Sequence, residues 1–269
     1  MGVVEQALLD VSTRVATEAA ELALTCRPDA ITDVDTKSSE TDVVTAADLA
    51  VERFVRDRLA ELRPGEPVLG EEAGGASAGS GGLCWVVDPI DGTVNYLYGF
   101  PWYAVSLAAQ VDGVSVAATV VEPVSGRRWT AARGHGAWLD GRPLRVSAAS
   151  RLDLALLGTG FAYRAERRSR QAAGVAELLG RVRDIRRAGA ASLDLCAVAA
   201  GWLDGYFEHG LNRWDWAGGA LVAEEAGAVV RLPDTPDALG PDLVVAAAPG
   251  IAADLDTALA AAGLTEPMP

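Results

Sequence analysis

The stretch Trp85-Val86-Val87-Asp88-Pro89-Ile90-Asp91-Gly92-Thr93-Val94-Asn95-Tyr96 places two carboxylates between an apolar run and a helix-start signal. Residues 83–87 are apolar and follow a Gly/Ser-rich loop, which is typical of a short, fully buried strand. Asp88 therefore stands at the C-terminal end of a strand, where α/β proteins place ligands. Pro89 fixes its own φ and biases Asp88 toward an extended backbone, so a stiff turn aims both acids at one point.

These two acids favour a cation site beside an anion site. Carboxylates at close range repel each other unless a cation lies between them, and hard divalent cations take carboxylate and carbonyl oxygens. The carbonyl of Ile90, between the acids, could add a ligand. Gly92 allows close backbone approach and free N–H groups at a helix start bind anions, so a phosphate would lie beside the metal. The alternative is a surface Asp-Pro turn with a helix cap.

Two further acidic clusters follow different signals. Asp215 opens a helix that begins with the small residues 217–220. An acid there is ordinarily a cap worth about 0.5–2 kcal/mol, but the run of small residues indicates that another element packs very close to this turn. Glu71 and Glu72 lead into a loop of residues 73–82, where a Glu pair alone is usually just solvated.

In this order, the clusters resemble the inositol monophosphatase family. Asp88-Pro89-Ile90-Asp91-Gly92-Thr93 matches its first signature, and Trp214-Asp215-Trp216-Ala217-Gly218-Gly219 with Glu225-Ala226-Gly227 matches its second. Further matches cover residues 37–38, 42–48, 70–72 and 186–191, so the resemblance spans almost the whole chain. Residues 158–161 and 206–210 look most similar to the actinobacterial inositol-1-monophosphatases.

The resemblance implies a mixed α/β fold, a layered α-β-α-β-α sandwich. Its N-terminal half, residues 1–148, would carry the first metal signature, and its C-terminal half, residues 149–269, the second. The active site would lie between the halves.

The resemblance also implies a magnesium site with two or three ions. In the family's pattern Glu71, Asp88 and the Ile90 carbonyl hold one Mg²⁺, and Asp88, Asp91 and Asp215 hold a second. Glu71 also helps to hold a third, weaker ion, which implies sensitivity to lithium. Paired ions of this kind stabilise the attacking and leaving oxygens of an in-line displacement.

The remaining roles concern water, phosphate and alcohol. The catalytic group would be Glu71, Thr93 and Asp48, in which Thr93, backed by Asp48, orients the attacking water. The amides of Gly92 and Thr93 would hold phosphate oxygens. The residues expected to face the alcohol part of the substrate are Asp91, Gly189, Ala190, Ala191 and Glu208. Lys37, the single lysine of the chain, and Glu72 are further candidates, although Lys37 is also explained as a chance survivor on a polar loop.

The implied activity is Mg²⁺-dependent hydrolysis of myo-inositol 1-phosphate to myo-inositol and phosphate. Small residues at 189–191 suit a compact ring, and the sequence shows no obvious second acid near Glu208 for a cationic amine. Ala190, where many relatives carry Ser or Thr, and Ala228 depart from the family's pattern and bear on substrate preference. The alternatives are a histidinol-phosphate phosphatase, a broad-specificity sugar or polyol phosphatase, and, from a different class, a protein-binding partner of transcription components.

Composition narrows the setting. The net charge of −14 and the absence of a basic stripe exclude nucleic acid as the main ligand. Three distant cysteines indicate buried thiols in a reducing compartment. Residues 1–24 predict an amphipathic helix rather than a signal peptide, and no apolar run of about 18 residues could span a membrane. We therefore expect a cytoplasmic enzyme, and a hydrophobic content of 50% together with the family resemblance favours a homodimer.

Periodicity predicts helices over residues 4–24, 46–62, 165–179, 191–200, 214–226 and 250–262. Strands are expected over residues 83–87, 155–160, 184–187, 203–207 and 243–247. Residues 105–121 form a hairpin signal around Asp112-Gly113, and Ser125-Gly126 marks another turn.

Overall fold

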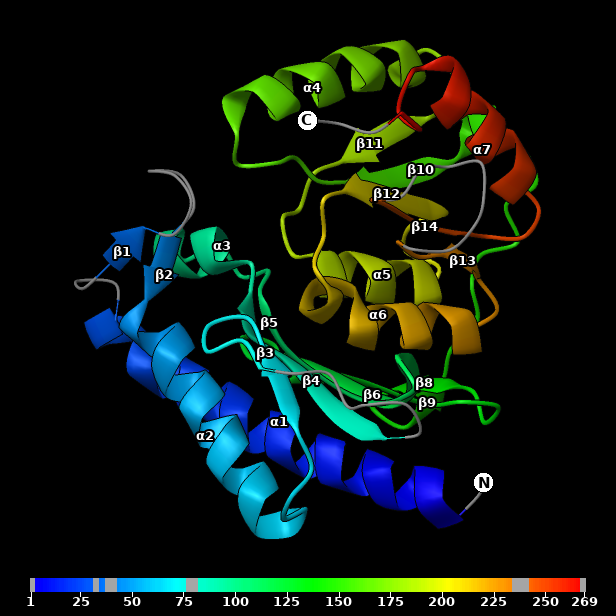
Figure 1. The fold of residues 1–269 in the computed structure, drawn as a ribbon. Coiled ribbons are helices and arrows are strands. Elements are labelled where there is room, and N and C mark those ends of the chain that lie inside the picture. The colour runs from blue at the N-terminus through cyan, green and yellow to red at the C-terminus, as the bar shows by residue number, and fades with distance from the viewer. Residues whose placement is uncertain (1–2, 31–33, 37–42, 76–81, 234–241, 267–269) are drawn as a thin grey trace.

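The computed structural model describes residues 3–30, 34–36, 43–75, 82–233 and 242–266. They form five layers in which two sheets alternate with three pairs of helices (Figure 1). The order is α1 with α2, a seven-stranded sheet, α5 with α6, a five-stranded sheet, and α4 with α7. The expected α-β-α-β-α sandwich is confirmed.

The larger sheet consists, in spatial order, of β3 (Val68–Gly70), β4 (Leu83–Asp91), β5 (Ala104–Val111), β6 (Val114–Glu122), β7 (Arg127–Ala132), β8 (Ala137–Leu139) and β9 (Arg142–Pro143). β3 and β4 are parallel, and the strands from β4 to β9 are antiparallel neighbours. Asp112 and Gly113 join β5 to β6 with φ of 52° and 79°, the positive values that a tight hairpin turn needs. The hairpin prediction is confirmed.

The smaller sheet has the order β11 (Asp184–Arg186), β10 (Leu156–Thr159), β12 (Gly205–His209), β14 (Leu243–Ala247) and β13 (Val229–Arg231). The first three strands are parallel, and β14 is antiparallel to both of its neighbours. Apart from these sheets, β1 (Val34–Thr36) pairs antiparallel with β2 (Val43–Thr45).

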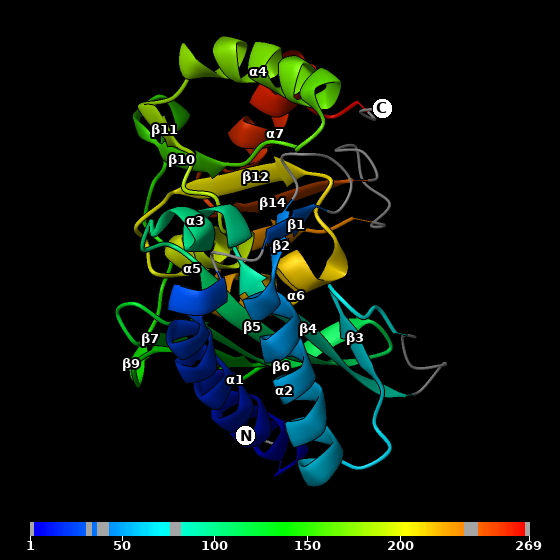
Figure 2. The same ribbon diagram turned by 90° about the vertical axis from the view of Figure 1, so that its left-hand side faces the viewer.

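The helices are α1 (Val3–Ala30), α2 (Ala46–Leu62), α3 (Thr93–Tyr98), α4 (Ala165–Leu179), α5 (Ala191–Ala199), α6 (Arg213–Glu225) and α7 (Ala252–Ala261), with a 3₁₀ turn at Leu152–Leu154. α1 and α2 run side by side over the outer face of the larger sheet (Figure 2). α2 begins in a capping box: the Thr45 side chain accepts from the backbone N–H of Asp48, and the Asp48 side chain accepts from the backbone N–H of Thr45.

The middle core joins the two halves of the chain. Trp129 from the larger sheet, Leu195 and Leu221 from α5 and α6, and Val244 from the smaller sheet are fully or almost fully buried in one cluster. These residues come from both sides of position 148. The helix pair α5 and α6 is therefore packed between the apolar faces of the two sheets, which fixes the position of both helices.

The structure modifies several local expectations. α1 continues to Ala30, and β4 continues through Pro89 to Asp91, whereas the sequence predicted a helix end near 24 and a strand end at 87. Cys84 and Cys196 are buried free thiols as expected, but Cys26, in the last turns of α1, is half-buried because it packs at the rim of the core. Within the described ranges, no helix is long and apolar enough to cross a membrane.

Candidate active site

One cavity of about 380 Å³ collects residues from both signatures. The predicted residues that line it are Glu71, Asp88, Ile90, Asp91, Gly92, Thr93, Gly189, Ala191, Glu208 and Asp215. Three predicted residues do not line it: Asp48 lies behind Thr93, Ala190 is buried, and Glu72 is half-buried in the turn after β3. Lys37 lies outside the described residues.

The end of β4 carries the first pair of acids. Its pairing with β5 is regular as far as Asp88 and resumes at Asp91, so the residues between them form an irregularity in the ladder. Pro89 has no N–H to offer the ladder, and a local irregularity accommodates it. The amide of Ile90 donates to Asp88 Oδ1 at 3.1 Å, which fixes the first carboxylate in the turn.

Thr93 begins α3 and is held by two acceptors. Its hydroxyl lies 3.2 Å from Asp48 Oδ1 and 3.1 Å from the Ile90 carbonyl oxygen. Asp48 Oδ2 in turn accepts from the amide and hydroxyl of Thr45, at 2.8 and 2.6 Å. The expected link from Asp48 to Thr93 is therefore present in the structure.

Gly92 turns the chain from β4 into α3. Its φ of 89° lies in the left-handed region, and a Cβ there would lie 3.1 Å from the carbonyl oxygens of Gly189 and Trp102. A side chain at this position would meet both strain and crowding. Gly92 thus brings the first signature into close contact with the segment before α5.

Asp91 reaches across to the N-terminus of α5. Oδ1 accepts from the Ala191 amide at 3.1 Å, and Oδ2 accepts from the amide and hydroxyl of Ser192 at 2.7 and 2.5 Å. An acid at a helix N-terminus satisfies unpaired N–H groups. Sequence reasoning missed Ser192, whose polar side chain in the first turn of a predicted helix was the available signal.

Asp215 enters the cavity from the first turn of α6. Asn212 is the N-cap, and its amide donates to Asp215 Oδ2 at 2.6 Å in a capping box. A Cβ on Gly218 would lie 2.5 Å from Ser106 Oγ, and one on Gly219 would lie 2.7 Å from the Ser192 carbonyl oxygen. The predicted close approach is confirmed, and the packed elements are β5 and α5.

The acids of the cavity are crowded by negative charge. Burial, and then the charge of Glu71, raises the pKa of Asp88 well above its usual range, and the same two causes raise the pKa of Asp215. Burial raises the pKa of Asp91 to about 6, against the hydrogen bonds from α5 that lower it. Among the described residues, no ion pair involves Asp88, Asp91 or Asp215.

The side of the cavity lined by Glu208 and Arg187, called the far wall below, is polar as well. Tyr206 donates to Glu208 Oε2 at 2.5 Å, and burial raises the pKa of Glu208 to about 7 while Tyr206 and Arg187 lower it. Gly160 leaves room for this carboxylate, because a Cβ there would overlap it. Asp194 is buried close enough for the charge of Glu208 to raise its pKa, after burial itself. Asp194, on α5, does not line the cavity, so the expectation that no second acid beside Glu208 is available to a cationic amine stays a prediction.

The donor set suits a hard cation, although the side chains do not yet surround one. Among the described residues, no three His, Cys, Asp or Glu side chains stand in an arrangement that could hold a metal ion. Asp91 and Asp215 instead face backbone amides of α5 and α6. Side-chain rotations that bring carboxylate oxygens into the cavity would provide the all-oxygen ligands of Mg²⁺ or Ca²⁺.

Comparison with known proteins agrees with this site. Residues 5–264 match the inositol monophosphatase family. An inositol-1-monophosphatase of Mycobacterium leprae is 56% identical over 235 residues, covering 84% of this chain and 81% of its own. A Pseudomonas aeruginosa protein named Nus factor SuhB is 43% identical, with 84% and 85% covered. The solved structure of Mycobacterium tuberculosis SuhB aligns with a TM-score of 0.83 at 44% identity, covering 96% of this chain and 98% of its own.

The chain belongs to the inositol monophosphatase family, whose members are generally metal-dependent and act on small phosphomonoesters. It is an enzyme, a phosphoric monoester hydrolase of the inositol-phosphate phosphatase class.

Proposed function

We propose that this protein hydrolyses myo-inositol 1-phosphate to myo-inositol and phosphate in a Mg²⁺-dependent reaction. The observation that carries the proposal is the convergence of Asp88, Asp91 and Asp215 from both signatures in one cavity, without a protein cation paired to them among the described residues. Buried carboxylates that raise one another's pKa are stabilised when divalent cations lie between them.

The proposed metal ligands follow the expected pattern. Glu71, Asp88 and the Ile90 carbonyl would hold one ion, and Asp88, Asp91 and Asp215 a second. A third, weaker ion at Glu71 would make the enzyme sensitive to Li⁺. When bound, Mg²⁺ would supply charge stabilisation for the attacking and leaving oxygens.

The chain itself would orient the reactants. Because the Thr93 hydroxyl can donate to Asp48, its lone pairs would be available to accept a hydrogen bond from the attacking water and so hold that water in line. Gly92 and Thr93 line the cavity at the start of α3, where their amides would hold phosphate oxygens. Glu71 would share the catalytic role with Thr93 and Asp48.

Recognition of the alcohol is assigned to the far wall. Glu208 can accept hydrogen bonds from hydroxyl groups of a polyol, and Gly189 and Ala191 leave space for a compact ring. The Ala191 amide already donates to Asp91, so Asp91 would connect the metal region to the alcohol side. Ala190 is buried, and its proposed contribution is through the backbone.

A second substrate class has an observation in its favour. Glu208 lines the cavity and could pair with the ammonium group of histidinol phosphate, and the buried Asp194 adds negative charge near Glu208 without lining the cavity itself. Arg187 lines the same cavity and lowers the pKa of Glu208, which opposes a cationic substrate. This guanidinium keeps inositol 1-phosphate as the preferred substrate.

The test is phosphate release from both esters at matched Mg²⁺, by wild-type protein and by Asp91→Asn. We expect a higher kcat/KM for inositol 1-phosphate and a loss of orders of magnitude in the variant. A tenfold preference for histidinol phosphate would reverse the substrate assignment. Near-wild-type turnover by Asp91→Asn would remove the metal assignment.

Three further properties belong to the proposal. We place the enzyme in the cytoplasm, in keeping with its three free thiols. We expect a homodimer, because Tyr98 at the end of α3 and Phe100 just after the helix expose 82% and 53% of their surface. A mass of one chain in light scattering would contradict this. A separate protein-binding role has one support, the relative named Nus factor SuhB. Retention of an added transcription protein by an inactive variant would test that role.

A further inference from the structure

One face of α2 contacts the segment that brings Glu71 into the cavity. Asp48, Glu52 and Arg56 are spaced four residues apart and so lie on the same face of the helix. Asp48 accepts from Thr93, as described above. Glu52 and Arg56 form hydrogen bonds with the turn that follows β3.

Glu52 is 1% exposed and its carboxylate lies inside a turn. Oε2 accepts from the Glu72 amide at 2.7 Å, and Oε1 accepts from the Ala73 amide at 3.0 Å. Arg56 Nε donates to Oε1 at 2.8 Å. The two amides that follow Glu71 are therefore held by one charged group on α2.

Arg56 closes the same turn from outside. Its guanidinium donates to the carbonyl oxygens of Val68 at 3.1 Å and of Gly74 at 2.5 Å. The Gly70 amide donates to the Gly74 carbonyl at 3.0 Å, so the turn begins and ends on one backbone bridge. Residues 68–74 are thus tied to α2 at Val68, at the Glu72 and Ala73 amides, and at Gly74.

The sequence makes room for this contact at Gly70. A Cβ there would lie 2.4 to 2.7 Å from the carboxylate atoms of Glu52. The φ of Gly70 is not in the left-handed region, so the space taken by Glu52, and not backbone strain, accounts for glycine at this position. A buried carboxylate is costly unless ion pairs and hydrogen bonds compensate it, and this one has three donors.

We propose that Glu52 is a positioning residue for the metal site: it fixes the backbone from which Glu71 reaches the cavity. The inference rests on the proposed Mg²⁺ role of Glu71. Groups that orient metal ligands commonly change metal affinity about 10- to 100-fold when they are replaced. Glu52 acts through the turn and does not line the cavity.

The decisive variant is Glu52→Gln, which keeps the shape but places an NH₂ group opposite one of its donors. The control is Glu61→Gln on the same helix, where the side chain is 62% exposed. We expect Glu52→Gln to raise the Mg²⁺ concentration for half-maximal phosphatase rate about tenfold or more. The rate at saturating Mg²⁺ should stay within about threefold of wild type, because excess ion repopulates the site. Glu61→Gln should change neither value.

A second readout does not depend on activity. Hydrogen exchange of the Glu72 and Ala73 amides in metal-free protein should accelerate at least about tenfold in Glu52→Gln, with β4 amides unchanged. If Glu52→Gln does not fold, Arg56→Gln tests the same turn from a side chain that is 27% exposed, with the same directions expected.

The outcomes separate the two proposals. Wild-type Mg²⁺ dependence in a folded Glu52→Gln or Arg56→Gln overturns the positioning role and leaves the phosphatase assignment intact. A lower Tm alone, with Mg²⁺ dependence unchanged, also overturns it, because a purely structural contact would give that result. A wild-type protein without Mg²⁺-dependent phosphate release overturns the proposed function and the positioning role together. In that case, faster exchange of the Glu72 and Ala73 amides in Glu52→Gln would show that Glu52 only stabilises the turn.

Discussion

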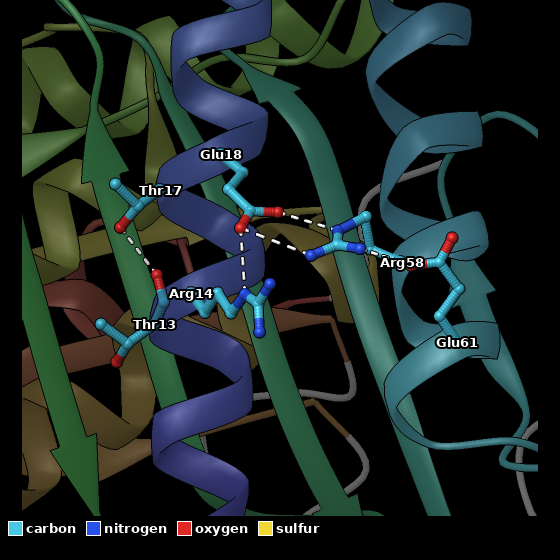
Figure 3. A network of polar contacts seen from close by, with 6 residues as sticks. All are labelled: Thr13, Arg14, Thr17, Glu18, Arg58 and Glu61. Atoms are coloured by element: carbon cyan, nitrogen blue, oxygen red, sulfur yellow. Dashed lines mark hydrogen bonds and ion pairs between the residues drawn. The ribbon is translucent and has the colours of Figure 1, made fainter.

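Two groups of acids in this molecule are treated in opposite ways. Glu18 lies between α1 and α2, where Arg14 Nε donates to it at 3.0 Å and Arg58 Nε at 2.9 Å (Figure 3). The hydrogen bond from Arg58, and then that from Arg14, lowers the pKa of Glu18. Asp88 is 1% exposed, and the charges that raise its pKa, after burial, are those of other acids.

The difference indicates which acids of the chain need a metal ion or protons from solution to offset their charge. The helix pair supplies its own cations, so its electrostatics are complete within the protein. The cavity gathers carboxylates whose burial is compensated by no described ion pair, which is unfavourable unless a metal ion or protons are bound. The two regions should therefore respond differently to substitution, pH, metal and salt.

The largest difference should appear in catalysis. Asp88→Asn removes a ligand charge shared by two proposed metal ions, and we expect kcat/KM to fall roughly a thousandfold, about 4 kcal/mol in transition-state stabilisation. Glu18→Gln should stay within about twofold of wild type because it lies outside the cavity. Phosphate-release kinetics check both, and equal losses in the two variants would break the contrast.

The pH dependence of stability should have opposite signs in the two regions. The pKa of Glu208 rises from its ordinary 4.5 to about 7 on folding, so its contribution is fully present below about 4.5 and is lost as pH rises through 7. The metal-free free energy of unfolding should fall by up to about 3 kcal/mol over that range. Glu208→Gln should flatten the slope in chelator-treated protein, measured by urea unfolding.

Glu18 works in the other direction. Because its pKa is lowered, its contribution is present above the ordinary carboxyl pKa and is lost as pH falls through the folded value. Glu18→Gln should thus leave the slope between pH 5 and 8 unchanged. Identical slopes in wild type and Glu208→Gln would show that Glu208 does not titrate as described.

The rise in Tm on Mg²⁺ binding should depend on the acids of the cavity and not on the acid between the helices. At Mg²⁺ about 100 times its dissociation constant, binding adds about 2.7 kcal/mol, or several degrees in Tm. Glu18→Gln should keep this shift, whereas Asp88→Asn should lose most of it. Thermal unfolding with Mg²⁺ and with chelator measures the difference, and a full shift in Asp88→Asn would contradict its role as a ligand.

The smallest effect is expected from the helix pair itself. Glu18→Gln should lower Tm by no more than about 3 °C, because its side chain is 34% exposed and partly exposed ion pairs contribute little. The difference should shrink at 1 M salt, which screens such pairs. A larger loss that persists in salt would mean that packing, and not charge, joins α1 to α2.

The acids of the site could be predicted because each belongs to a local pattern. Asp88 and Asp91 flank a proline behind an apolar run, and Asp215 precedes a run of small residues. Their partners carry no such pattern. Ser192 is 101 residues from Asp91, and Glu52 is 20 residues from Glu72 and looks like any solvated acid on an amphipathic helix. Ser192 and Glu52 have their roles because they are buried beside their partners, and that burial results from packing between segments that are distant in the sequence.

The fold shows the same division. The long periodic helices α2 and α4 were predicted to the residue, because their apolar spacing is local. β13 and β8 are three residues long and exist through their neighbours in the sheet, which no short window reveals. The continuation of β4 past Pro89 was missed because proline normally ends a ladder, whereas here an irregularity absorbs it.

Gly218 and Gly219 have a consequence for ion size. They set the separation of α6 from β5 and α5, since any Cβ would lie within 2.7 Å of atoms in those elements. α6 carries Asp215, and the Ser192 that Gly219 touches holds Asp91, so this glycine-wide gap sets how far the carboxylates of the two signatures stand apart. We expect a methyl group at either glycine to move α6 outward and to shift ion preference from Mg²⁺, with bonds of about 2.0–2.1 Å, toward Ca²⁺, with bonds of about 2.3–2.6 Å. Titration of Gly219→Ala with the two ions would test this.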